Sequence, residues 1–178
     1  MTHYSLSKIS DNKNSKSVAY TLRDDIFSIN TEIINQLLEL ATHDQANNIR
    51  ICIHKNEEAL FQQMLIYERK GIYYPPHIHT NRSETHIVLK GSLELFILDK
   101  NGAVLETHIN SENDSNITTV SSPIPHLTRP ISEFVIYLEI KNGPHTPFAS
   151  DCFIPRPFGL ESLSEREYND YLDKFSSS

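Results

Sequence analysis

The chain has 178 residues, the length of a single domain that can bury a hydrophobic core without disulfides. Its formal net charge is -7 and its 16 Lys and Arg residues are scattered, which argues against a protein that binds nucleic acid or an anionic membrane. The two cysteines, Cys52 and Cys152, lie far apart and lack a CxxC partner, which indicates reduced thiols and a cytoplasmic protein, with one long-range disulfide as the alternative.

The N-terminal segment is rich in Ser, Asn and Lys, so residues 1–17 are predicted to be a flexible tail. It has no apolar signal-peptide core, and no stretch of the chain approaches membrane-spanning length, so nothing indicates export. Residues 18–178 are expected to form one domain. Its first element is a helix predicted over 31–42, which Asn30 or Thr31 can cap and whose apolar residues recur at helical spacing: Ile33, Ile34, Leu37, Leu38 and Ala41.

Two strands are predicted next, over 49–54 and 60–68. In the first of them, apolar and polar residues alternate, which places three isoleucines on one face and Arg50, Cys52 and His54 on the other. This polar face either lines a ligand cavity, which Arg50 and His54 would reach, or lies in water on the outside of the sheet.

Short strands separated by turn signals favour an antiparallel sandwich or barrel with its core at about 49–141. The later strands are predicted over 92–99, 103–109, 117–120 and 133–141. A proline-rich segment, about 142–160, is expected to form an extended strap that covers the barrel or an opening in it. The last predicted element is a helix of about 164–175, which begins with a capping box from Ser164 to Glu167.

The stretch from Gly71 to Gly91 contains three candidate metal ligands. His77 and His79 point to one face of an extended chain, because successive side chains alternate between faces. Glu84 follows a polar turn and begins an apolar strand. Two imidazoles on one face and a carboxylate from the next strand favour a metal site with nitrogen and oxygen ligands.

The spacing of Gly71, His77, His79, Glu84 and Gly91 is that of the first motif of the cupin superfamily, which the chain resembles. Beyond this motif, the order of segments is similar to that of the WbuC family of cupin-fold metalloproteins, small proteins encoded with genes for surface-polysaccharide (O-antigen) biosynthesis. The segments that carry the likeness are RICIH, QQML, PPHIH, ETHIVLKGSLELFILDKNG, YLEIKNGPH and the proline-rich strap.

This resemblance implies a mainly β fold: a cupin barrel (double-stranded β-helix or jelly roll) with an N-terminal and a C-terminal helix. It implies a metal with four protein ligands: His77, His79, Glu84 and His126. The remaining coordination positions are left for water or substrate. His126 stands where the second cupin motif has its last ligand, although Ser121 and Pro123 replace the proline and the glycine of that motif.

Three imidazoles and one carboxylate suit a divalent transition metal, and Zn, Fe, Mn, Ni and Cu all fit this ligand set. Such a site supports a metal-dependent enzyme of the isomerase or oxygenase type. The polysaccharide setting of the family points to a sugar or sugar nucleotide as the small-molecule ligand. Two alternatives stay open: a non-catalytic module that binds a metal or ligand, and a metal-free sugar isomerase or epimerase that uses His with Tyr67, Tyr73 or Tyr74.

His86 is predicted to share a face with Glu84, because one residue of a strand separates them. A histidine inside a β-barrel needs a polar partner. His86 is therefore a fifth ligand, a catalytic general acid or base beside the metal, or a core histidine bonded to a backbone carbonyl, which is the role we favour. Arg50, His54 and Tyr73 are the candidate ligand-binding residues. A homodimer is expected, since a second copy commonly covers the edge strands of such sandwiches.

Overall fold

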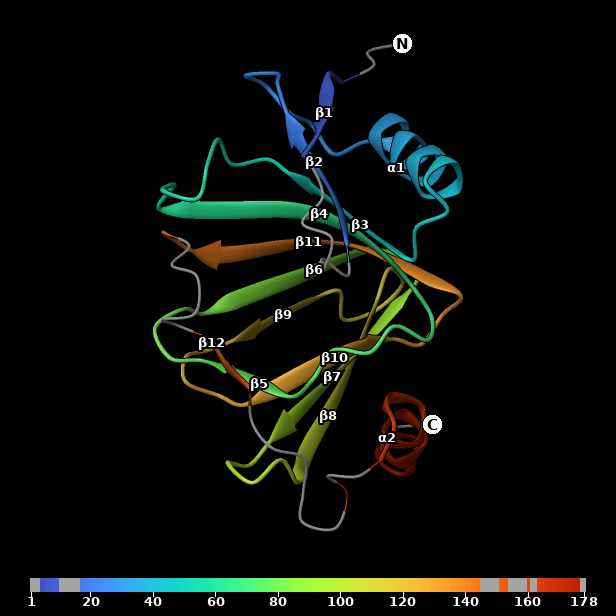
Figure 1. Cartoon of the computed structure of the whole chain (residues 1–178), viewed down its shortest axis with the longest axis vertical. Helices are drawn as coiled ribbons and strands as arrows, with labels where there is room; N and C mark the ends of the chain where they lie inside the picture. The colour runs from blue at the N-terminus through green and yellow to red at the C-terminus, as the bar shows by residue number, and fades with distance from the viewer. Residues whose placement is uncertain (1–3, 10–16, 145–150, 154–159, 161–162, 177–178) are drawn as a thin grey trace.

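Two β-sheets face each other in the computed structural model, which describes residues 4–9, 17–144, 151–153, 160 and 163–176 (Figure 1). The larger sheet has seven strands in the order β1-β2-β3-β4-β11-β6-β9, and the smaller has five in the order β12-β5-β10-β7-β8. One apolar cluster lies between the sheets and draws on both: Ile66, Val88, Leu93, Val135 and Tyr137. The predicted mainly β fold with an N-terminal and a C-terminal helix is confirmed.

The strands of the larger sheet are β1 (Leu6–Lys8), β2 (Val18–Leu22), β3 (Asn48–Cys52), β4 (Phe61–Arg69), β6 (Glu84–Lys90), β9 (Ile117–Val120) and β11 (Phe134–Asn142). Those of the smaller sheet are β5 (His77–His79), β7 (Ser92–Leu98), β8 (Val104–Ser111), β10 (His126–Pro130) and β12 (Asp151–Phe153). The helices are α1 (Thr31–His43), α2 (Glu165–Leu172) and the short 3-10 helix η1 (Asp173–Phe175).

Helix α1 begins where the sequence predicts it. The side chain of Asn30 accepts hydrogen bonds from the backbone N–H groups of Glu32 and Ile33, at 3.0 and 3.1 Å, and so caps the helix. The buried face of α1 packs on the outer side of the larger sheet, in a cluster that includes Ile33, Leu37, Ala41, Ile49, Ile51, Leu65 and Ile136. The isoleucine face of β3 is thus used for packing, which leaves its polar face for the inside of the barrel. No helix in the described ranges is long and apolar enough to cross a membrane.

The prediction of a flexible tail over residues 1–17 is wrong for Leu6–Lys8. These residues form β1, which pairs antiparallel with β2, and β2 in turn pairs parallel with β3. Leu6 and Tyr4 pack against the cluster beneath α1, which gives this polar segment an apolar anchor. Residues 1–3 and 10–16, which belong to the same prediction, lie outside the described part of the chain.

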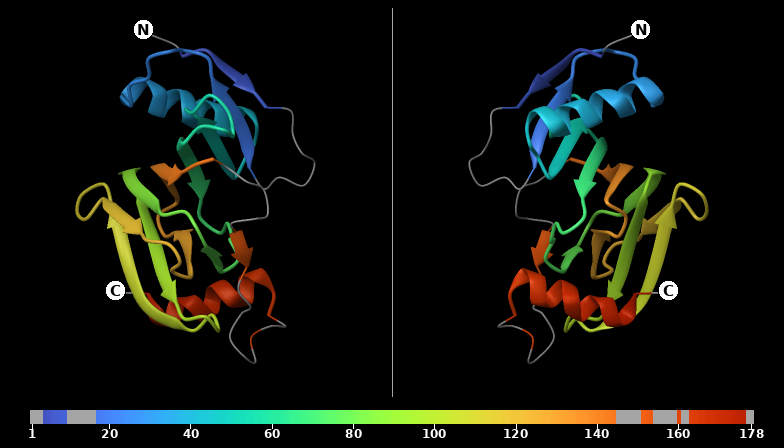
Figure 2. Two further views of the ribbon diagram at one scale, coloured as in Figure 1. Left: turned by 90° about the vertical axis from the view of Figure 1, so that its left-hand side faces the viewer. Right: turned by 90° about the vertical axis from the view of Figure 1, so that its right-hand side faces the viewer.

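Helix α2 and the smaller sheet meet at the other end of the long axis from α1 (Figure 2). The predicted capping box is present, because Ser164 and Glu167 each bind the other's backbone N–H. Tyr168 and Leu172 are fully buried in the cluster under α2. Most of the proline-rich strap predicted over 142–160 lies outside the described residues, but its segment β12 pairs with β5.

Gly91 is placed in a turn that only glycine can make without strain. Its φ is +79°, and an added Cβ would lie 2.3 Å from the carbonyl oxygen of Phe134 and 2.6 Å from Oγ of Ser132. We therefore expect Gly91→Ala to lower the free energy of unfolding by about 3 kcal/mol. Urea unfolding measures this effect. Gly71→Ala is the matched control, because its φ is also positive but a Cβ there meets nothing within 4 Å, and an equal loss in both variants would contradict the steric account.

Candidate metal centre

The four predicted metal ligands meet between the two sheets. His77 and His79 are the ends of β5, and His126 begins β10 as the cross-strand partner of His77. Glu84 begins β6 in the larger sheet. The ligand atoms that these four side chains offer all lie within 4.8 Å of one another. Both sheets therefore contribute to one compact group of three imidazoles and a carboxylate.

Glu84 lies at the centre of the group. Its Oε2 is 3.0 Å from Nε2 of His79, and its Oε1 is 2.5 Å from Nε2 of His126. The ring centroid of His77 is 4.9 Å from that of His79 and 4.4 Å from that of His126. Because metal bonds of about 2.0–2.2 Å hold neighbouring donor atoms about 3 Å apart, this donor set fits one divalent ion.

The backbone fixes the orientation of two of the imidazoles. Nδ1 of His77 lies 3.1 Å from the carbonyl oxygen of Pro75, and Nδ1 of His126 lies 2.8 Å from that of Ile124. A carbonyl oxygen only accepts hydrogen bonds, so each Nδ1 carries a proton and each Nε2 is the nitrogen that is left to bind a metal. This is the second-sphere arrangement typical of metal-binding histidines.

The charges around the group also suit a metal. Burial lowers the pKa of His77 to about 3, so that its ring is neutral near pH 7. Burial by itself would raise the pKa of Glu84, but the ammonium of Lys141 and the nearby imidazoles outweigh it and hold that pKa well below its ordinary value. Nζ of Lys141 lies 2.8 Å from Oε2 of Glu84 and also contacts Oε1 of Glu139. A neutral His77 and an ionised Glu84 are the protonation states that metal binding requires.

His86 lies beside the four ligands. Its Nε2 is 3.6 Å from Oε1 of Glu84, and its ring meets that of Tyr137 edge-on at 5.6 Å between centroids. Its Nδ1 is buried and has no hydrogen-bond partner among the described residues, so the predicted bond to a backbone carbonyl is wrong. Burial lowers the pKa of His86 and favours the neutral ring. His86 forms a second close group with Glu84 and Glu139, but the two carboxylates of that group share the Lys141 ammonium.

A cavity of about 460 Å³ adjoins the group and extends along the inner face of the larger sheet. His77, Glu84 and His86 form part of its wall. Arg50 and His54 line the same cavity, so the polar face of β3 borders it. Arg50 is also exposed to solvent, and His54 lies just beyond the end of that strand. Cys52, on the same face, is a free thiol.

Tyr73 does not reach this cavity, and its prediction as a ligand-binding residue is wrong. It packs in the cluster under α2, with its ring centroid 6.0 Å from that of Tyr168. Tyr74 lines the cavity in its place. The two tyrosines precede β5 in an irregular segment, where the alternation of a strand gives no guide to side-chain direction.

Other polar residues of the cavity wall were not predicted from the sequence, among them Asn48, Glu68, Glu139 and Lys141. A signal for two of them exists in the period of two along β11, because Tyr137, Glu139 and Lys141 occupy alternate positions. That face is too polar for an ordinary barrel core and marks the cavity floor.

Glu68 gives the stability of the protein a specific pH dependence. The side chain is 2% exposed, and burial raises its pKa from 4.5 to about 7 in spite of a hydrogen bond from Tyr137. The folded state therefore binds more protons than the unfolded state between pH 4.5 and 7, and stability falls as the pH rises through this window. Since one pKa unit corresponds to about 1.4 kcal/mol, the loss reaches about 3 kcal/mol.

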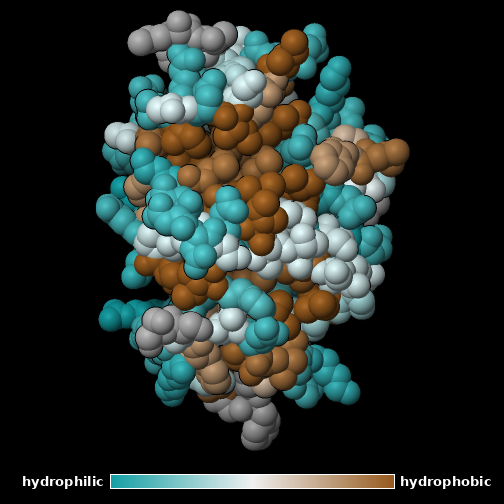
Figure 3. All heavy atoms as spheres, turned by 180° about the vertical axis from the view of Figure 1, so that it is seen from behind, coloured by the Kyte–Doolittle hydropathy of each residue, from teal (hydrophilic) through white to brown (hydrophobic). Residues whose placement is uncertain are grey.

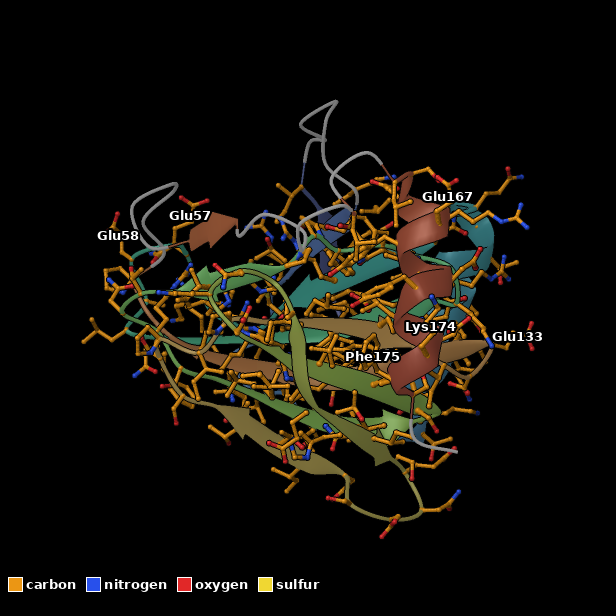
Figure 4. The ribbon with its side chains drawn as sticks, turned by 90° about the horizontal axis from the view of Figure 1, so that it is seen from below. Glu57, Glu58, Glu133, Glu167, Lys174 and Phe175 are labelled. Carbon is orange, nitrogen blue, oxygen red and sulfur yellow. The ribbon has the colours of Figure 1, made fainter. Side chains whose placement is uncertain are left out.

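We expect Glu68→Gln to abolish this loss, so that the variant gains about 3 kcal/mol over the wild type between pH 5 and pH 8. Urea unfolding at the two pH values measures the gain. Glu133→Gln makes the same chemical change on an exposed side chain and should follow the wild type (Figure 4). An identical pH dependence in Glu68→Gln and the wild type would contradict a raised pKa of Glu68.

Comparison with known proteins supports the fold. Residues 29–109 match the family model described as "Domain of unknown function (DUF6016)". No curated protein matches the chain.

Several solved structures resemble the chain. CapF with the inhibitor 3-isopropenyl-tropolone aligns with a TM-score of 0.51 and 14% identity, over 58% of this chain and 30% of CapF. An RmlC-like cupin family protein from Methanocaldococcus jannaschii has a double-stranded β-helix fold. It aligns with a TM-score of 0.45 and 19% identity, over 67% of this chain and 91% of the cupin protein. Oxalate decarboxylase from Bacillus subtilis, which has Mn(II) centres, aligns with a TM-score of 0.43 and 20% identity. The alignment covers 64% of this chain and 28% of the decarboxylase. The matched part thus spans under a third of CapF, and the likeness concerns the fold.

Proposed function

We propose that this cupin-fold protein binds one divalent transition metal through His77, His79, Glu84 and His126. We further propose that it is a metal-dependent enzyme that acts on a small polar ligand, such as a sugar or sugar nucleotide, in surface-polysaccharide biosynthesis. The observation that carries the metal site is the convergence of three imidazoles and one carboxylate within 4.8 Å. The polysaccharide setting rests on the resemblance to the WbuC family.

The adjoining cavity supports an enzyme rather than a closed metal site. Structural metal sites are fully coordinated by protein, whereas catalytic sites keep positions for water or substrate beside an accessible space. A bound ion would supply a Lewis acid, which polarises an oxygen of the ligand. Lys141 keeps Glu84 ionised, and the backbone carbonyls of Pro75 and Ile124 orient their imidazoles.

We propose that His86 transfers a proton as a general base or acid in this reaction. Its ring is buried in the cavity wall beside Glu84, and its Nδ1 has no partner among the residues that the structure describes. A neutral imidazole in a cavity wall can accept a proton from a ligand. Arg50 and His54, which line the same cavity, are the proposed ligand-binding residues.

Water relaxation in the manganese-loaded protein tests the proposed function. If the site leaves coordination positions for water, bound Mn²⁺ should raise the relaxation rate of bulk water protons, and a ligand that binds the metal should reduce this enhancement. Manganese that is bound without any enhancement would contradict an enzyme and favour the non-catalytic metal-binding module.

The metal-free sugar isomerase or epimerase is the second candidate, favoured by the 2.5 Å contact between His126 and Glu84, a histidine and carboxylate pair. Tyr74 lines the cavity and is the tyrosine that would transfer a proton in this isomerase. Failure of the protein to bind any divalent metal after reconstitution would favour this candidate. The cytoplasmic location stays a prediction from the cysteine content.

We also propose that the protein is a homodimer. The described ends of the sheets, such as β8 and β9, carry exposed apolar side chains, among them Leu105 and Ile117 at 67% and 56% exposure. Apolar residues gather on the face seen from behind (Figure 3). A second copy of the chain would cover the unpaired strand edges and the exposed apolar side chains. Light scattering during size-exclusion chromatography would give twice the mass of the chain, and a monomer mass would contradict the proposal.

A further inference from the structure

The wall of the cavity lacks the negative charge of the chain as a whole. The chain has 16 basic and 23 acidic residues and a formal net charge of -7. The wall contains four glutamates and an equal number of basic residues: Arg50, Lys55, Arg82 and Lys141. Its formal charge is therefore zero, and a bound divalent ion would make it positive.

The glutamates of the wall leave this positive charge largely available to a ligand. The carboxylates of Glu84 and Glu139 both contact the ammonium of Lys141. Burial raises the pKa of Glu68 to about 7, so its carboxyl group is only partly ionised near pH 7. Glu57, the fourth glutamate, is exposed at the rim of the cavity (Figure 4). The inner carboxylates are thus occupied or partly neutral, and one exposed carboxylate remains at the rim.

Arg50 presents its charge to the cavity without a partner. It lies on the face of β3 that borders the cavity, and it makes no hydrogen bond or ion pair with any residue that the structure describes. Its register partners on the neighbouring strands are Ala19 and Ile66, which carry no charge. A guanidinium is a planar fork of N–H donors that matches the oxygens of a phosphate or carboxylate and stays charged at physiological pH. Arg50 is therefore available to an anionic ligand.

His54 and Lys55 continue the same segment and line the same cavity. We call Arg50, His54 and Lys55 the β3 rim. Nδ1 of His54 lies 2.9 Å from the backbone oxygen and 3.2 Å from the backbone nitrogen of Gln63, which leaves Nε2 for a ligand. Nζ of Lys55 is 3.9 Å from Oδ1 of Asp25, and the two side chains are 88% and 93% exposed, so this ion pair is weak. Both residues can therefore turn to an anion that binds Arg50.

One ligand can reach from the β3 rim to the metal ligands. Strands β3 and β6 are separated by β4 and β11, so three strand spacings place them about 14 Å apart. A row of register partners crosses these strands: His86, Glu139, Met64 and Cys52. All four side chains line the cavity, and Arg50 follows Cys52 on the same face of β3. The cavity is thus continuous from the β3 rim to the wall beside Glu84.

We infer that the ligand of this cavity is an anionic sugar derivative whose phosphoryl or carboxylate group binds Arg50, with His54 and Lys55 beside it. Its sugar ring extends toward the metal ligands. This inference rests on the proposed function and deepens it, because it selects charged sugars over neutral ones. Two parallel N–H bonds from a guanidinium to an anion fix the direction of the ligand as well as its position.

Calorimetric titration of the full chain tests the inference with four probes that share one sugar: glucose, glucose 1-phosphate, glucuronate and UDP-glucose. The protein is stripped of metal with EDTA and then dialysed, so that no probe binds through an ion. At least one charged probe should bind the wild type about tenfold or more tightly than glucose does, and Arg50→Met should abolish this preference. Binding of the two phosphorylated probes alone identifies a phosphoryl group, and binding of glucuronate alone identifies a carboxylate.

Arg69→Met is the matched control, because Arg69 is also an exposed strand arginine but does not border the cavity. It should keep the preference of the wild type. Two results would overturn the inference: charged probes that bind the wild type no more tightly than glucose, absence of all binding included, or the same preference in Arg50→Met and the wild type.

Elemental analysis of the same wild-type protein, before it is stripped, separates this test from that of the proposed function. A wild type that contains metal but shows no preference for a charged probe overturns the inference alone. A wild type that binds no metal even after reconstitution, but whose preference for a charged probe is lost in Arg50→Met, supports the β3 rim and contradicts the metal-dependent enzyme.

Discussion

His126→Ala is expected to lower the affinity for Zn²⁺ about a hundredfold or more. His126 is fixed by the carbonyl of Ile124 and directs its Nε2 at Glu84, so its removal deletes a direct ligand from the group. Loss of an outer-sphere partner alone costs about 10-fold to 100-fold in metal affinity, and loss of a direct ligand costs more. Competition with a chromophoric zinc chelator measures the change.

His108→Ala is the matched control for this prediction. His108 is also a strand histidine, on β8, but its side chain is 42% exposed and pairs with Glu106 rather than with the metal ligands. Its replacement should leave zinc affinity unchanged. If His126→Ala bound zinc with the affinity of the wild type, His126 would not be a metal ligand. The site would then consist only of His77, His79 and Glu84.

Lys141→Met should lower the free energy of unfolding of the metal-free protein by about 4 kcal/mol. The ammonium of Lys141 contacts both Glu84 and Glu139, which are 3% and 7% exposed. Without it, two buried carboxylates remain close together and lose the ammonium that they share, and breaking a buried ion pair costs about 3–5 kcal/mol. Urea unfolding in the presence of EDTA measures the loss.

Added zinc should restore part of the stability of Lys141→Met, because the ion brings positive charge to Glu84 and binds only the folded state. Lys174→Met, at an exposed lysine beside the C-terminus, should change stability by about 0.5 kcal/mol or less (Figure 4). If Lys141→Met and the wild type had the same free energy of unfolding in EDTA, the Lys141 ammonium would not stabilise the two buried carboxylates.

The local part of the metal site is readable from the sequence, and the distant part is not. His77, His79 and Glu84 fall within one short motif, and strand alternation predicts that the two histidines share a face. His126 joins them only through the pairing of β10 with β5. Strand pairing between distant segments depends on the whole fold, so here the resemblance to cupins supplied what periodicity does not.

The errors have related physical causes. Lys141 and Glu68 were overlooked because a strand pattern shows which residues share a face but not whether that face lines a cavity. The direction of the Tyr73 side chain could not be predicted, because Tyr73 lies outside a strand, where side chains do not alternate between two faces. The polar composition of the N-terminus concealed β1, whose order comes from pairing with β2 and from the packing of Leu6.

The central claim is the metal site, and elemental analysis of the purified protein without an affinity tag tests it most directly. The wild type should contain close to one divalent transition metal per chain, and the double variant His77→Ala/His79→Ala should contain none, because two of the four ligands are lost. Absence of metal from the wild type, even after reconstitution with divalent ions, would contradict the metal site and favour the metal-free isomerase.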